Sequence, residues 1–450
     1  MRASVQLPGS KSITNRALIL AALADGPTTI TGPLRARDTD LMAGAVTALG
    51  ASIDDSATIQ AGNGEIPASR SGPAQPTWTV SPGWASGAIA VDVGNAGTVL
   101  RFVPPAAALV TGDVEFSGDP RAAHRPVGQL LAGLRQAGVE VDDGGRGAAP
   151  FVVRGRGRVR GGTVALDASS SSQLVSGLML AAPLFEQGIQ ISHNGTRIPS
   201  APHIAMTADM LRAAGADVES WSSGSASASE RNSASRDGQS APDSWRVRPG
   251  RLAPGTIMVE PDLSNAAPFL ASALVTGGAV TIPGWPAVSL QAASQILDLL
   301  ERMGASRQAT ADGMRITGTG TIRGITADLR DINELAPVLT ALAALADSPS
   351  EFTGIGHMRF HESDRLAVLA SEIGALGGHV TELPDGLRIQ PRPLRATSQP
   401  FDSHDDHRMV MAAAVLGLAV PGLRVRDAST VAKTFPGFLT LWQQMLEQAN

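Results

Sequence analysis

Six stretches of the chain share one pattern of polar and apolar positions. Each opens with small polar residues, continues through a nearly unbroken apolar run, and ends at a Gly or Pro break. Ser, Asn and Asp are typical helix caps, and Gly and Pro typically end helices. Because the runs are apolar on almost every side, the pattern predicts helices that lie buried in a core. The six stretches begin at Ser12, Asn95, Ser171, Leu263, Ile332 and Asp405.

A second pattern follows each of these stretches. It places apolar residues three and four positions apart with charges between them, which predicts an amphipathic helix. Most of these segments end in Gly and a short β-rich stretch, such as 139–141 or 380–382, before a turn. The repeating unit is therefore helix, strand, helix, hairpin, which differs from the single alternating strands of a Rossmann chain. The amphipathic segments are 37–53, 124–141, 202–218, 288–306, 362–380 and 434–450.

Six units divide naturally into two domains of three, with a boundary near Met258. Residues 220–243 are Ser-rich and poor in apolar residues. We interpret this segment as a flexible hairpin tip between strands at 218–221 and 245–248. The alternative, an interdomain linker, is less favoured because a strand pair flanks the segment. Smaller tips are expected at 54–77 and 142–149.

Composition narrows the class of protein. The chain has 450 residues, 43% of them hydrophobic, no Cys, and a formal net charge of −5. The absence of Cys excludes disulfides, thiolate zinc sites and cysteine nucleophiles. A negative net charge argues against a protein that coats nucleic acid. No apolar run is long enough for a membrane span. We therefore expect a cytoplasmic globular protein.

Lysine is rare in this chain. Of the 36 basic residues only Lys11 and Lys433 are lysines, and the others are arginines. An ammonium is a compact point charge, whereas a guanidinium is a wide planar fork. The two lysines either stand at positions where the function needs a compact ammonium and not a planar guanidinium, or they occur there by chance. Composition alone does not decide between these interpretations.

Cations and small polar residues recur at the starts of the predicted helices and in the loops before them. Helix N-termini carry unpaired N–H groups and partial positive charge, so a face where they gather attracts anions. Because this net-acidic chain places its cations at corresponding positions of a repeat, we expect a polyanionic ligand. These positions are Lys11, Ser12, Arg16, Asn95, Gly97, Arg101, Arg125, Ser171, Ser172, Gln173, Ser200, Glu334, His361, Arg365, His407, Arg408 and Lys433.

Two other motifs are weaker indications of function. The segment GSKS around Lys11 fails as a phosphate-binding P-loop, because Ser10 and Val5 stand where that motif requires Gly. The pairs His404/His407 and His357/His361 have spacings that a metal could use. Neighbouring arginines would repel a cation and zinc usually needs three convergent ligands, so we expect no metal.

Several segments in register resemble the signature segments of the 5-enolpyruvylshikimate-3-phosphate synthase family. They are PGSKSITNRALILAALADG, NAGTVLRF, HRP, SSQLVSG, FHESDRLAVL, DDHRMVMA and AKTFPGF, and they span nearly the whole chain. The resemblance implies transfer of the enolpyruvyl group of phosphoenolpyruvate to the 5-hydroxyl of 3-phosphoshikimate. It also implies an α/β, two-domain enolpyruvyl transferase fold with six repeats and an active-site cleft between domains. The implied domains are 13–257 and, because the first residues join the second domain, 1–12 with 258–450. No cofactor, nucleic acid or membrane is implied, and we expect a monomer.

The resemblance also implies two sets of ligand-binding residues. Arginine forks match phosphate and carboxylate oxygens, and serine hydroxyls complete the anion shells. For 3-phosphoshikimate the set is Lys11, Ser12, Arg16, Ser171, Ser172, Gln173, Ser200, Glu334 and His361. For phosphoenolpyruvate the set is Lys11, Gly97, Arg125, Gln173, Arg365, Arg408 and Lys433.

The implied mechanism is addition followed by elimination. Such a reaction needs a base near the acceptor hydroxyl, an acid near the methylene carbon, and cations for the leaving phosphate. Glu334 is the expected base, and Glu362 and Lys433 are candidates for the other proton transfers. Lys11, Arg125 and Lys433 would stabilise the phosphate, so both lysines of the chain fall at this site.

The chain departs from the familiar bacterial pattern at two positions. It has Glu334 where Asp is usual and His361 where Lys is usual. Glutamate keeps the carboxylate with a longer reach, whereas histidine is a weaker cation whose charge depends on pH.

Two other functions stay open at this stage. UDP-N-acetylglucosamine enolpyruvyl transferase shares the architecture but commonly uses a loop Cys, which this chain lacks. A non-catalytic binding protein for phosphate ligands would not need Glu334, Glu362 and Lys433 together, because acidic groups in an anion pocket cost affinity.

Overall fold

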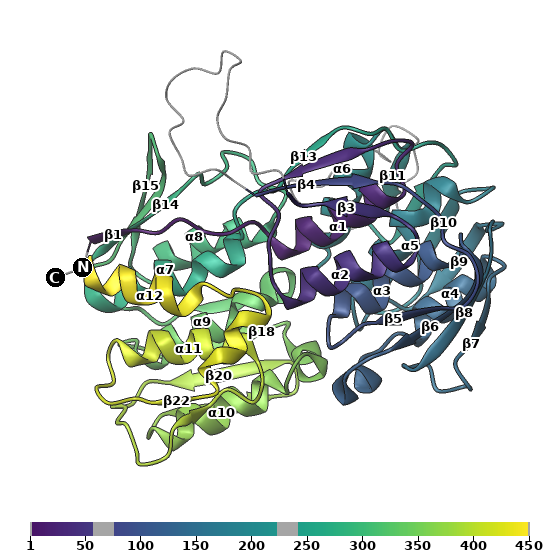
Figure 1. Cartoon of the computed structure of the whole chain (residues 1–450). Helices are drawn as coiled ribbons and strands as arrows, with labels where there is room; N and C mark the ends of the chain where they lie inside the picture. Colours follow the sequence, from purple (N-terminus) through teal and green to yellow (C-terminus); the bar gives the residue numbers. More distant parts are fainter. Residues whose placement is uncertain (1, 57–75, 223–241, 449–450) are drawn as a thin grey trace. The chain divides into compact units, whose positions relative to one another are not determined.

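The computed structural model describes residues 2–56, 76–222 and 242–448. Within the described ranges, six buried helices form the centres of six repeats, as the apolar stretches predict. Figure 1 labels each of these helices. Nearly every residue of these helices is buried, because their apolar side chains surround the helix axis. The buried helices are α1 (Lys11–Ala22), α3 (Gly97–Ala107), α5 (Gln173–Ala181), α7 (Leu263–Thr276), α9 (Ala336–Ala344) and α11 (His407–Gly417).

Each buried helix is followed by a second helix in the same unit, which confirms the predicted order. The helix predicted at 288–306 is shorter than expected: residues 288–291 are not helical and a 3₁₀ turn (Ala292–Gln295) precedes α8. The second helices are α2 (Arg37–Ala48), α4 (Gly128–Gln136), α6 (Pro202–Ala213), α8 (Ile296–Arg302), α10 (Arg365–Ala375) and α12 (Phe438–Glu447).

In the part of the chain that the structure describes, five of the repeats have a four-stranded sheet, and each of these sheets contains the predicted strand and hairpin. Each sheet also has a parallel edge strand that the sequence pattern did not predict. Within each sheet the strands are given in the order in which they lie side by side. In the Gly9–Glu260 part of the chain the three sheets are β13 (Thr256–Met258), β2 (Thr28–Thr31), β4 (Thr77–Ser81), β3 (Ser52–Asp54); β5 (Ile89–Asp92), β6 (Thr111–Ser117), β8 (Phe151–Arg156), β7 (Glu140–Asp142); and β9 (Gly162–Leu166), β10 (Ile189–His193), β12 (Ser244–Val247), β11 (Val218–Trp221). The other two are β1 (Arg2–Ser4), β14 (Ala279–Pro283), β16 (Gly313–Thr317), β15 (Ser306–Thr310); and β17 (Thr326–Asp328), β18 (Ser350–Thr353), β20 (Gly386–Gln390), β19 (His379–Leu383). The sixth unit has the parallel pair β21 (Phe401–Asp402) and β22 (Val425–Arg426).

The predicted strands around the Ser-rich segment pair with each other. Strands β11 and β12 are antiparallel, with Val218 opposite Val247 and Trp221 opposite Ser244. This pairing confirms the flanking hairpin strands. Most of the predicted Ser-rich tip and of the tip at 54–77 lies outside the described residues.

Contacts between residues divide the chain into two larger compact units, each containing three of the six repeats. One is Gly9–Glu260, and the other is Met1–Pro8 with Pro261–Asn450. Strand β1 pairs in parallel with β14 of the second unit, whereas β13 pairs in parallel with β2 of the first. In the repeats of α3, α5 and α9, the strand before the buried helix pairs with the strand after it. Strands β1 and β13, which precede α1 and α7, have therefore exchanged places relative to that pattern. The division falls a few residues from the predicted boundaries, because Lys11 already opens α1 and Met258 lies opposite Thr31.

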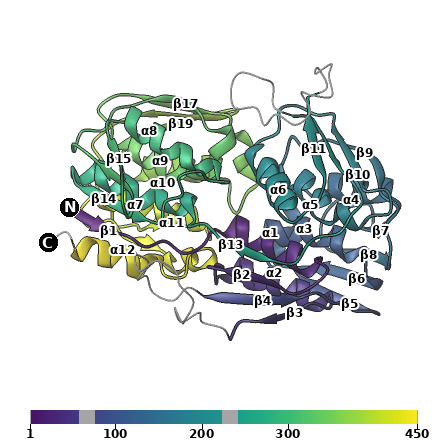
Figure 2. The same ribbon diagram turned by 90° about the horizontal axis from the view of Figure 1, so that it is seen from above.

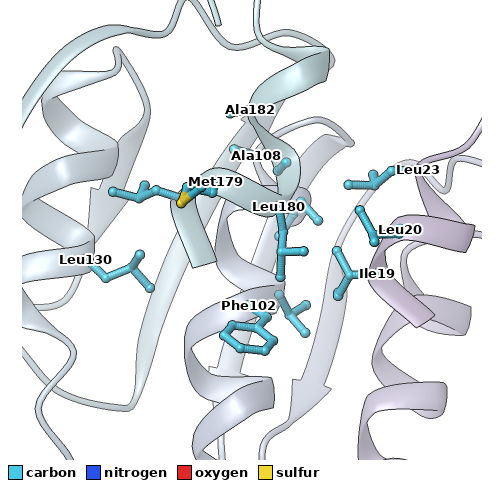
Figure 3. Packing of buried hydrophobic residues seen from close by; sticks show 14 of the residues in the cluster. Ile19, Leu20, Leu23, Phe102, Ala108, Leu130, Met179, Leu180 and Ala182 are labelled. Carbon is cyan, nitrogen blue, oxygen red and sulfur yellow. The ribbon is translucent and has the colours of Figure 1, made fainter. Parts of the chain in front are cut away.

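In the Gly9–Glu260 unit the core forms where α1, α3 and α5 meet. Figure 3 shows Ile19 and Leu20 of α1 turned toward Leu180 of α5, with Phe102 of α3 beside them. All four side chains are at most 2% exposed. Burial of this kind contributes about 1.5–3 kcal/mol for each large apolar side chain, so the three helices are held as one block.

The other unit is organised in the same way around α7, α9 and α11. An aromatic cluster joins α12 to this core: the ring centroids of Phe269 and Phe438 lie 5.5 Å apart, and those of Phe438 and Trp442 lie 5.7 Å apart. Strand β1 and α12 lie side by side in both views (Figures 1 and 2), and Ser4 N donates to Gln448 Oε1 at 3.2 Å. The first strand and the last helix therefore complete the same unit.

No helix within the described ranges combines the length and the apolar character that a membrane crossing requires.

The close approach of α3 and α5 gives a testable prediction. A Cβ at Gly177 would lie 2.1 Å from the carbonyl oxygen of Arg101, whereas a Cβ at Gly44 of α2 meets nothing within 4 Å. Gly177→Ala should therefore destabilise the protein by about 1–3 kcal/mol through overpacking, despite the better helix propensity of Ala. Gly44→Ala should stabilise it by up to about 1 kcal/mol. Urea unfolding of both variants checks the contrast, and equal shifts would contradict the close helix contact.

Candidate active site

In the Gly9–Glu260 unit, the N-terminal turns of the buried helices adjoin one another. Asn15 Nδ2 of α1 donates to Thr98 Oγ1 of α3 at 2.7 Å, and Arg101 Nη1 of α3 donates to Gln173 Oε1 of α5 at 2.9 Å. The prediction that helix starts gather is therefore confirmed within this unit. Their N–H groups and the cations beside them form a region suited to anions.

Gly97, the first residue of α3, lies against the side chains of this region. A Cβ at this position would come within 2.5 Å of Arg125 Nη1, 3.0 Å of Arg101 Nη1 and 3.3 Å of Gln173 Oε1. Only glycine leaves the Arg125 guanidinium where it is. Gly97, Arg125 and Gln173, which sequence reasoning grouped together, are therefore neighbours in the fold.

Lys11 forms an ion pair that sequence reasoning did not anticipate. Its Nζ lies 3.1 Å from Asp38 Oδ2, on the second residue of α2. The pairing is partly buried, so it fixes the ammonium at the first turn of α1. The signal available in the sequence was an Asp-rich start, RDTD, in the amphipathic segment after the helix of Lys11.

Arg16 is 1% exposed, and none of the described carboxylates pairs with it. Burial lowers the pKa of its guanidinium to about 9, so the group is still charged at neutral pH. Burial also lowers the pKa of the nearby His203 to about 3, and Arg16 and Lys11 add to that effect. This part of the unit is therefore electropositive through Lys11 and Arg16, with a neutral imidazole beside them.

The predicted serines lie at the entries of α5 and α6. Ser171 Oγ accepts from the backbone N–H of Gln173 at 3.3 Å, and Ser172 is buried immediately before α5. Ser200 has a φ of 52°, in the left-handed region, two residues before α6 begins. A non-glycine residue rarely adopts this conformation without a functional or packing reason.

In the other unit, Arg365 is the centre of a buried network. Its Nε lies 2.8 Å from Asp406 Oδ2 and its Nη2 lies 2.8 Å from Glu362 Oε2. Ser363 Oγ also donates to Asp406 Oδ2, at 3.0 Å. Burial alone would raise the pKa of Asp406, but the charges of Arg365 and His407 together with the hydrogen bond from Arg365 hold that pKa below its ordinary value.

His361 joins the same network. Arg365 Nη1 donates to His361 Nδ1 at 3.2 Å, so in this geometry the neutral ring carries its proton on Nε2. The ring of His357 lies beside it, with centroids 5.4 Å apart, and burial lowers the pKa of His357 to about 4. With Nδ1 as an acceptor, the N–H donor of His361 is on Nε2.

The remaining predicted cations of this unit are held by backbone and by acidic side chains. Arg408 donates to the carbonyl oxygen and the hydroxyl of Ser264, at 3.0 and 2.8 Å. Lys433 Nζ lies 2.7 Å from Asp405 Oδ2 and 3.0 Å from the Asp405 carbonyl oxygen. Asp405 and its neighbour His404 both have positive φ, so a tight left-handed turn presents these acceptors.

Glu334 lies in a 3₁₀ turn (Arg330–Leu335) before α9 and not in the helix itself. Burial raises the pKa of its carboxyl group, and Asp262 adds to this, while Arg408 and Arg365 oppose it. Carboxyl groups whose pKa is raised by burial are frequent among general bases of active sites.

The histidine pair that suggested a metal has other partners. His404 Nε2 lies 3.1 Å from Glu372 Oε1, whereas His407 is buried beside Asp406 in α11. Among the residues that the structure describes, no three His, Asp or Glu side chains are grouped to hold a metal ion.

Each unit thus carries one group of predicted residues. The Gly9–Glu260 unit holds Lys11, Ser12, Arg16, Gly97, Arg125, Ser171, Ser172, Gln173 and Ser200, and the other unit holds Glu334, His361, Glu362, Arg365, Arg408 and Lys433. The acidic partners Asp38, Asp405 and Asp406 were not predicted, because one sequence does not show which acid pairs with which cation.

Known proteins share this fold over nearly the full chain. An EPSP synthase structure from Acinetobacter baumannii superposes with a TM-score of 0.73 at 24% identity, covering 99% of this chain and 95% of that one. A second structure of the enzyme from that organism gives 0.72, at 24% identity and with 99% and 96% covered. The enolpyruvyl transferase NikO from Streptomyces tendae gives 0.69 at 18% identity, covering 98% and 94%. At these identities the likeness confirms the predicted α/β enolpyruvyl transferase fold.

The sequence itself decides the family. The sequence model of the EPSP synthase family, described as 3-phosphoshikimate 1-carboxyvinyltransferase, matches residues 1–442. That match covers both units, both exchanged strands and each predicted site residue. The chain therefore belongs to the EPSP synthase family of transferases.

Proposed function

We propose that this enzyme transfers the enolpyruvyl group of phosphoenolpyruvate to the 5-hydroxyl of 3-phosphoshikimate, releasing phosphate. Membership of the family gives the reaction. The observation that supports the proposal is the placing of Glu334 and Glu362 among buried arginines. Carboxylates weaken anion binding unless they take part in chemistry, so a pocket built only for binding would not keep them.

We propose the following roles for the chain's own groups. Glu334 accepts the proton of the 5-hydroxyl as its oxygen bonds to the enol carbon, and Glu362 or Lys433 delivers a proton to the methylene carbon. In the second step that carbon loses a proton as the bond from the former enol carbon to phosphate breaks. Lys11, Arg125 and Lys433 stabilise the charge that develops on the departing phosphate.

We propose two binding sets for the substrates. Arg365 and Arg408 provide forks for phosphoenolpyruvate with Lys11, Gly97, Arg125, Gln173 and Lys433. Arg16 and the hydroxyls of Ser12, Ser171, Ser172 and Ser200, with Gln173, Glu334 and His361, bind 3-phosphoshikimate. His361 takes part as an N–H donor through Nε2, since Arg365 donates to its Nδ1.

The test is phosphate release from the purified protein with phosphoenolpyruvate and one of two acceptors. Release with 3-phosphoshikimate but not with UDP-N-acetylglucosamine is expected. Release only with the nucleotide sugar would keep the chemistry and overturn the acceptor. No release with either acceptor, from protein shown to be folded, would make a non-catalytic binding protein the better proposal.

Gly97→Ala tests the phosphoenolpyruvate set. The new Cβ would meet the end of the Arg125 side chain, which is flexible, so the fold should be kept while the guanidinium shifts. A displacement of about 1 Å can cost as much as about 100-fold in rate. We expect KM for phosphoenolpyruvate to rise about 10-fold or more and KM for 3-phosphoshikimate to change much less. Steady-state kinetics with each substrate varied in turn checks this, and equal changes in both would argue against the assignment of Gly97.

We also propose that the enzyme acts as a monomer in the cytoplasm on these small molecules. Light scattering should then give a mass near 46.2 kDa with and without substrates. A mass twice as large would overturn the monomer.

A further inference from the structure

We propose that Thr207 is a positioning residue, whose hydroxyl fixes the guanidinium of Arg16 in the orientation that binds the acceptor substrate. The inference rests on the proposed function, because it takes Arg16 as a ligand of 3-phosphoshikimate. Thr207 lies in the middle of α6 and is fully buried, so it does not belong to the predicted binding residues.

Three acceptors hold Arg16 in place. Its Nε donates to Thr207 Oγ1 at 2.7 Å, its Nη1 to the Ser12 carbonyl oxygen at 2.9 Å, and its Nη2 to the His203 carbonyl oxygen at 3.1 Å. The guanidinium also lies over Phe102, with Cζ 5.0 Å from the ring centroid. A guanidinium has five N–H bonds, so one hydrogen on each terminal nitrogen is left for a ligand.

Thr207 supplies the shortest of these bonds and the only one made by a side chain. Its hydroxyl is itself oriented, since it can donate its single proton to the His203 carbonyl oxygen at 2.9 Å or to Ser176 Oγ at 3.0 Å. With that proton engaged, a lone pair faces Arg16 Nε. The Nε bond fixes the rotation of the planar group, and this rotation decides where the two remaining N–H bonds point.

The charge of Arg16 explains why such a support is needed. No described carboxylate pairs with this buried guanidinium, and a buried charge without a counter-ion is costly. Neutral acceptors hold the group without cancelling its charge. An anionic ligand then meets a cation that is already oriented, which lowers the ordering cost of binding.

Thr207→Val is the first test, because valine has nearly the same size and lacks the hydroxyl that accepts from Arg16 Nε and donates to the His203 carbonyl oxygen or Ser176 Oγ. We expect KM for 3-phosphoshikimate to rise roughly 10- to 100-fold, while KM for phosphoenolpyruvate changes less than about 3-fold. Thr207→Ser restores the hydroxyl and should bring KM for 3-phosphoshikimate back to within about 3-fold of the parent. An unchanged KM in the valine variant, or no rescue by serine, would overturn the proposal.

Thr340→Val is the matched control. Thr340 is equally buried, in α9, but its Oγ1 makes no hydrogen bond to any of the residues that the structure describes. The same change of atoms there should leave both KM values unchanged. If Thr340→Val raised KM for 3-phosphoshikimate as much as Thr207→Val does, the effect would belong to core packing and the positioning role would be wrong.

A measurement that does not require catalysis tests the positioning role of Thr207 independently of the proposed function. The Nε–H resonance of Arg16 in a ¹⁵N-arginine spectrum can be identified by its loss in Arg16→Lys. It should shift or broaden in Thr207→Val and stay in place in Thr207→Ser. If the parent protein fails to use 3-phosphoshikimate, the proposed function is wrong. An Nε–H signal that is unchanged in Thr207→Val overturns the positioning role whatever the substrate.

Discussion

Glu334→Gln should abolish nearly all turnover and at the same time make the folded protein more stable. Loss of a general base typically costs about 10²–10⁴ in rate. Burial raises the pKa of Glu334, so keeping this carboxylate ionised in the folded state costs free energy. Glutamine has nearly the same size and no charge to bury. We therefore expect the melting temperature to rise by roughly 2–4 °C for each kcal/mol regained.

The sign of the pH dependence follows from the direction of the shift. A carboxyl group with a raised folded-state pKa holds its proton more tightly in the folded protein, so it lowers stability as pH rises above the ordinary Glu value. The gain from Glu334→Gln should therefore be large near pH 8 and vanish near pH 4. In the parent enzyme the base form is lost in acid, so kcat/KM should fall as pH drops through the raised pKa.

Melting curves at several pH values, together with phosphate release, measure both effects. Glu351→Gln is the control, since Glu351 pairs with Arg388 at the surface of a sheet at 2.9 Å. It should alter turnover and stability little. A Glu334→Gln enzyme with near-parental turnover would remove Glu334 from the role of base, and an unchanged melting curve would contradict the raised pKa.

Asp406→Asn should cause the largest loss of stability among the predictions made here. The change keeps the size of the side chain and an oxygen for the backbone N–H of Arg408, which Asp406 accepts at 2.9 Å. It removes the charge that faces buried Arg365. Removing one member of a buried ion pair costs about 3–5 kcal/mol. Because Glu362 still pairs with Arg365 at 2.8 Å, we expect the lower end of that range, about 3 kcal/mol, or roughly 6–12 °C in melting temperature. Phosphate release should fall as well, because Arg365 loses the partner that orients it.

The pH dependence distinguishes this ion pair from a packing effect. The pKa of Asp406 is held below its ordinary value, so its stabilising contribution is present above the ordinary Asp pKa and is lost as pH falls through the lowered one. The deficit of Asp406→Asn should therefore shrink in strong acid. Asp298→Asn is the control: Asp298 is exposed and pairs with Arg307 at 2.6 Å, and its loss should cost about 1 kcal/mol or less. Similar urea midpoints for the two variants would contradict the buried network.

Local pattern was sufficient to predict the helices and hairpins of this fold. The helix caps and the apolar runs are strong signals over ten or more residues, and the amphipathic helices repeat after each of them. The parallel edge strands were not predicted. Strands such as Ile89–Asp92 and Thr326–Asp328 are only three or four residues long, and their hydrogen-bonding partners are distant in sequence.

The candidate site could also be predicted only in part from the sequence. Helix starts and rare lysines indicated where charged groups could gather, and the family resemblance then selected Lys11 and Lys433; their roles stay predictions. The pairing of Lys11 with Asp38, and of Arg365 with Asp406, depends on tertiary contacts between separate elements. Thr207 gave no signal at all, since a threonine inside an amphipathic helix is ordinary.

The exchanged edge strands set the order in which this chain can fold on the ribosome. Arg2 pairs with Ala279, so strand β1 has no partner until the chain has been synthesised as far as residue 279. The unit built from Gly9 onward waits in turn for Thr256–Met258 to cover strand β2. Neither of these two sheets can gain its edge strand from residues close in sequence. Long-range pairing of this kind slows folding, and it leaves strand edges exposed until the partner has been synthesised. The nascent chain therefore depends on translation outpacing aggregation, a demand that a simple tandem of two domains would not make.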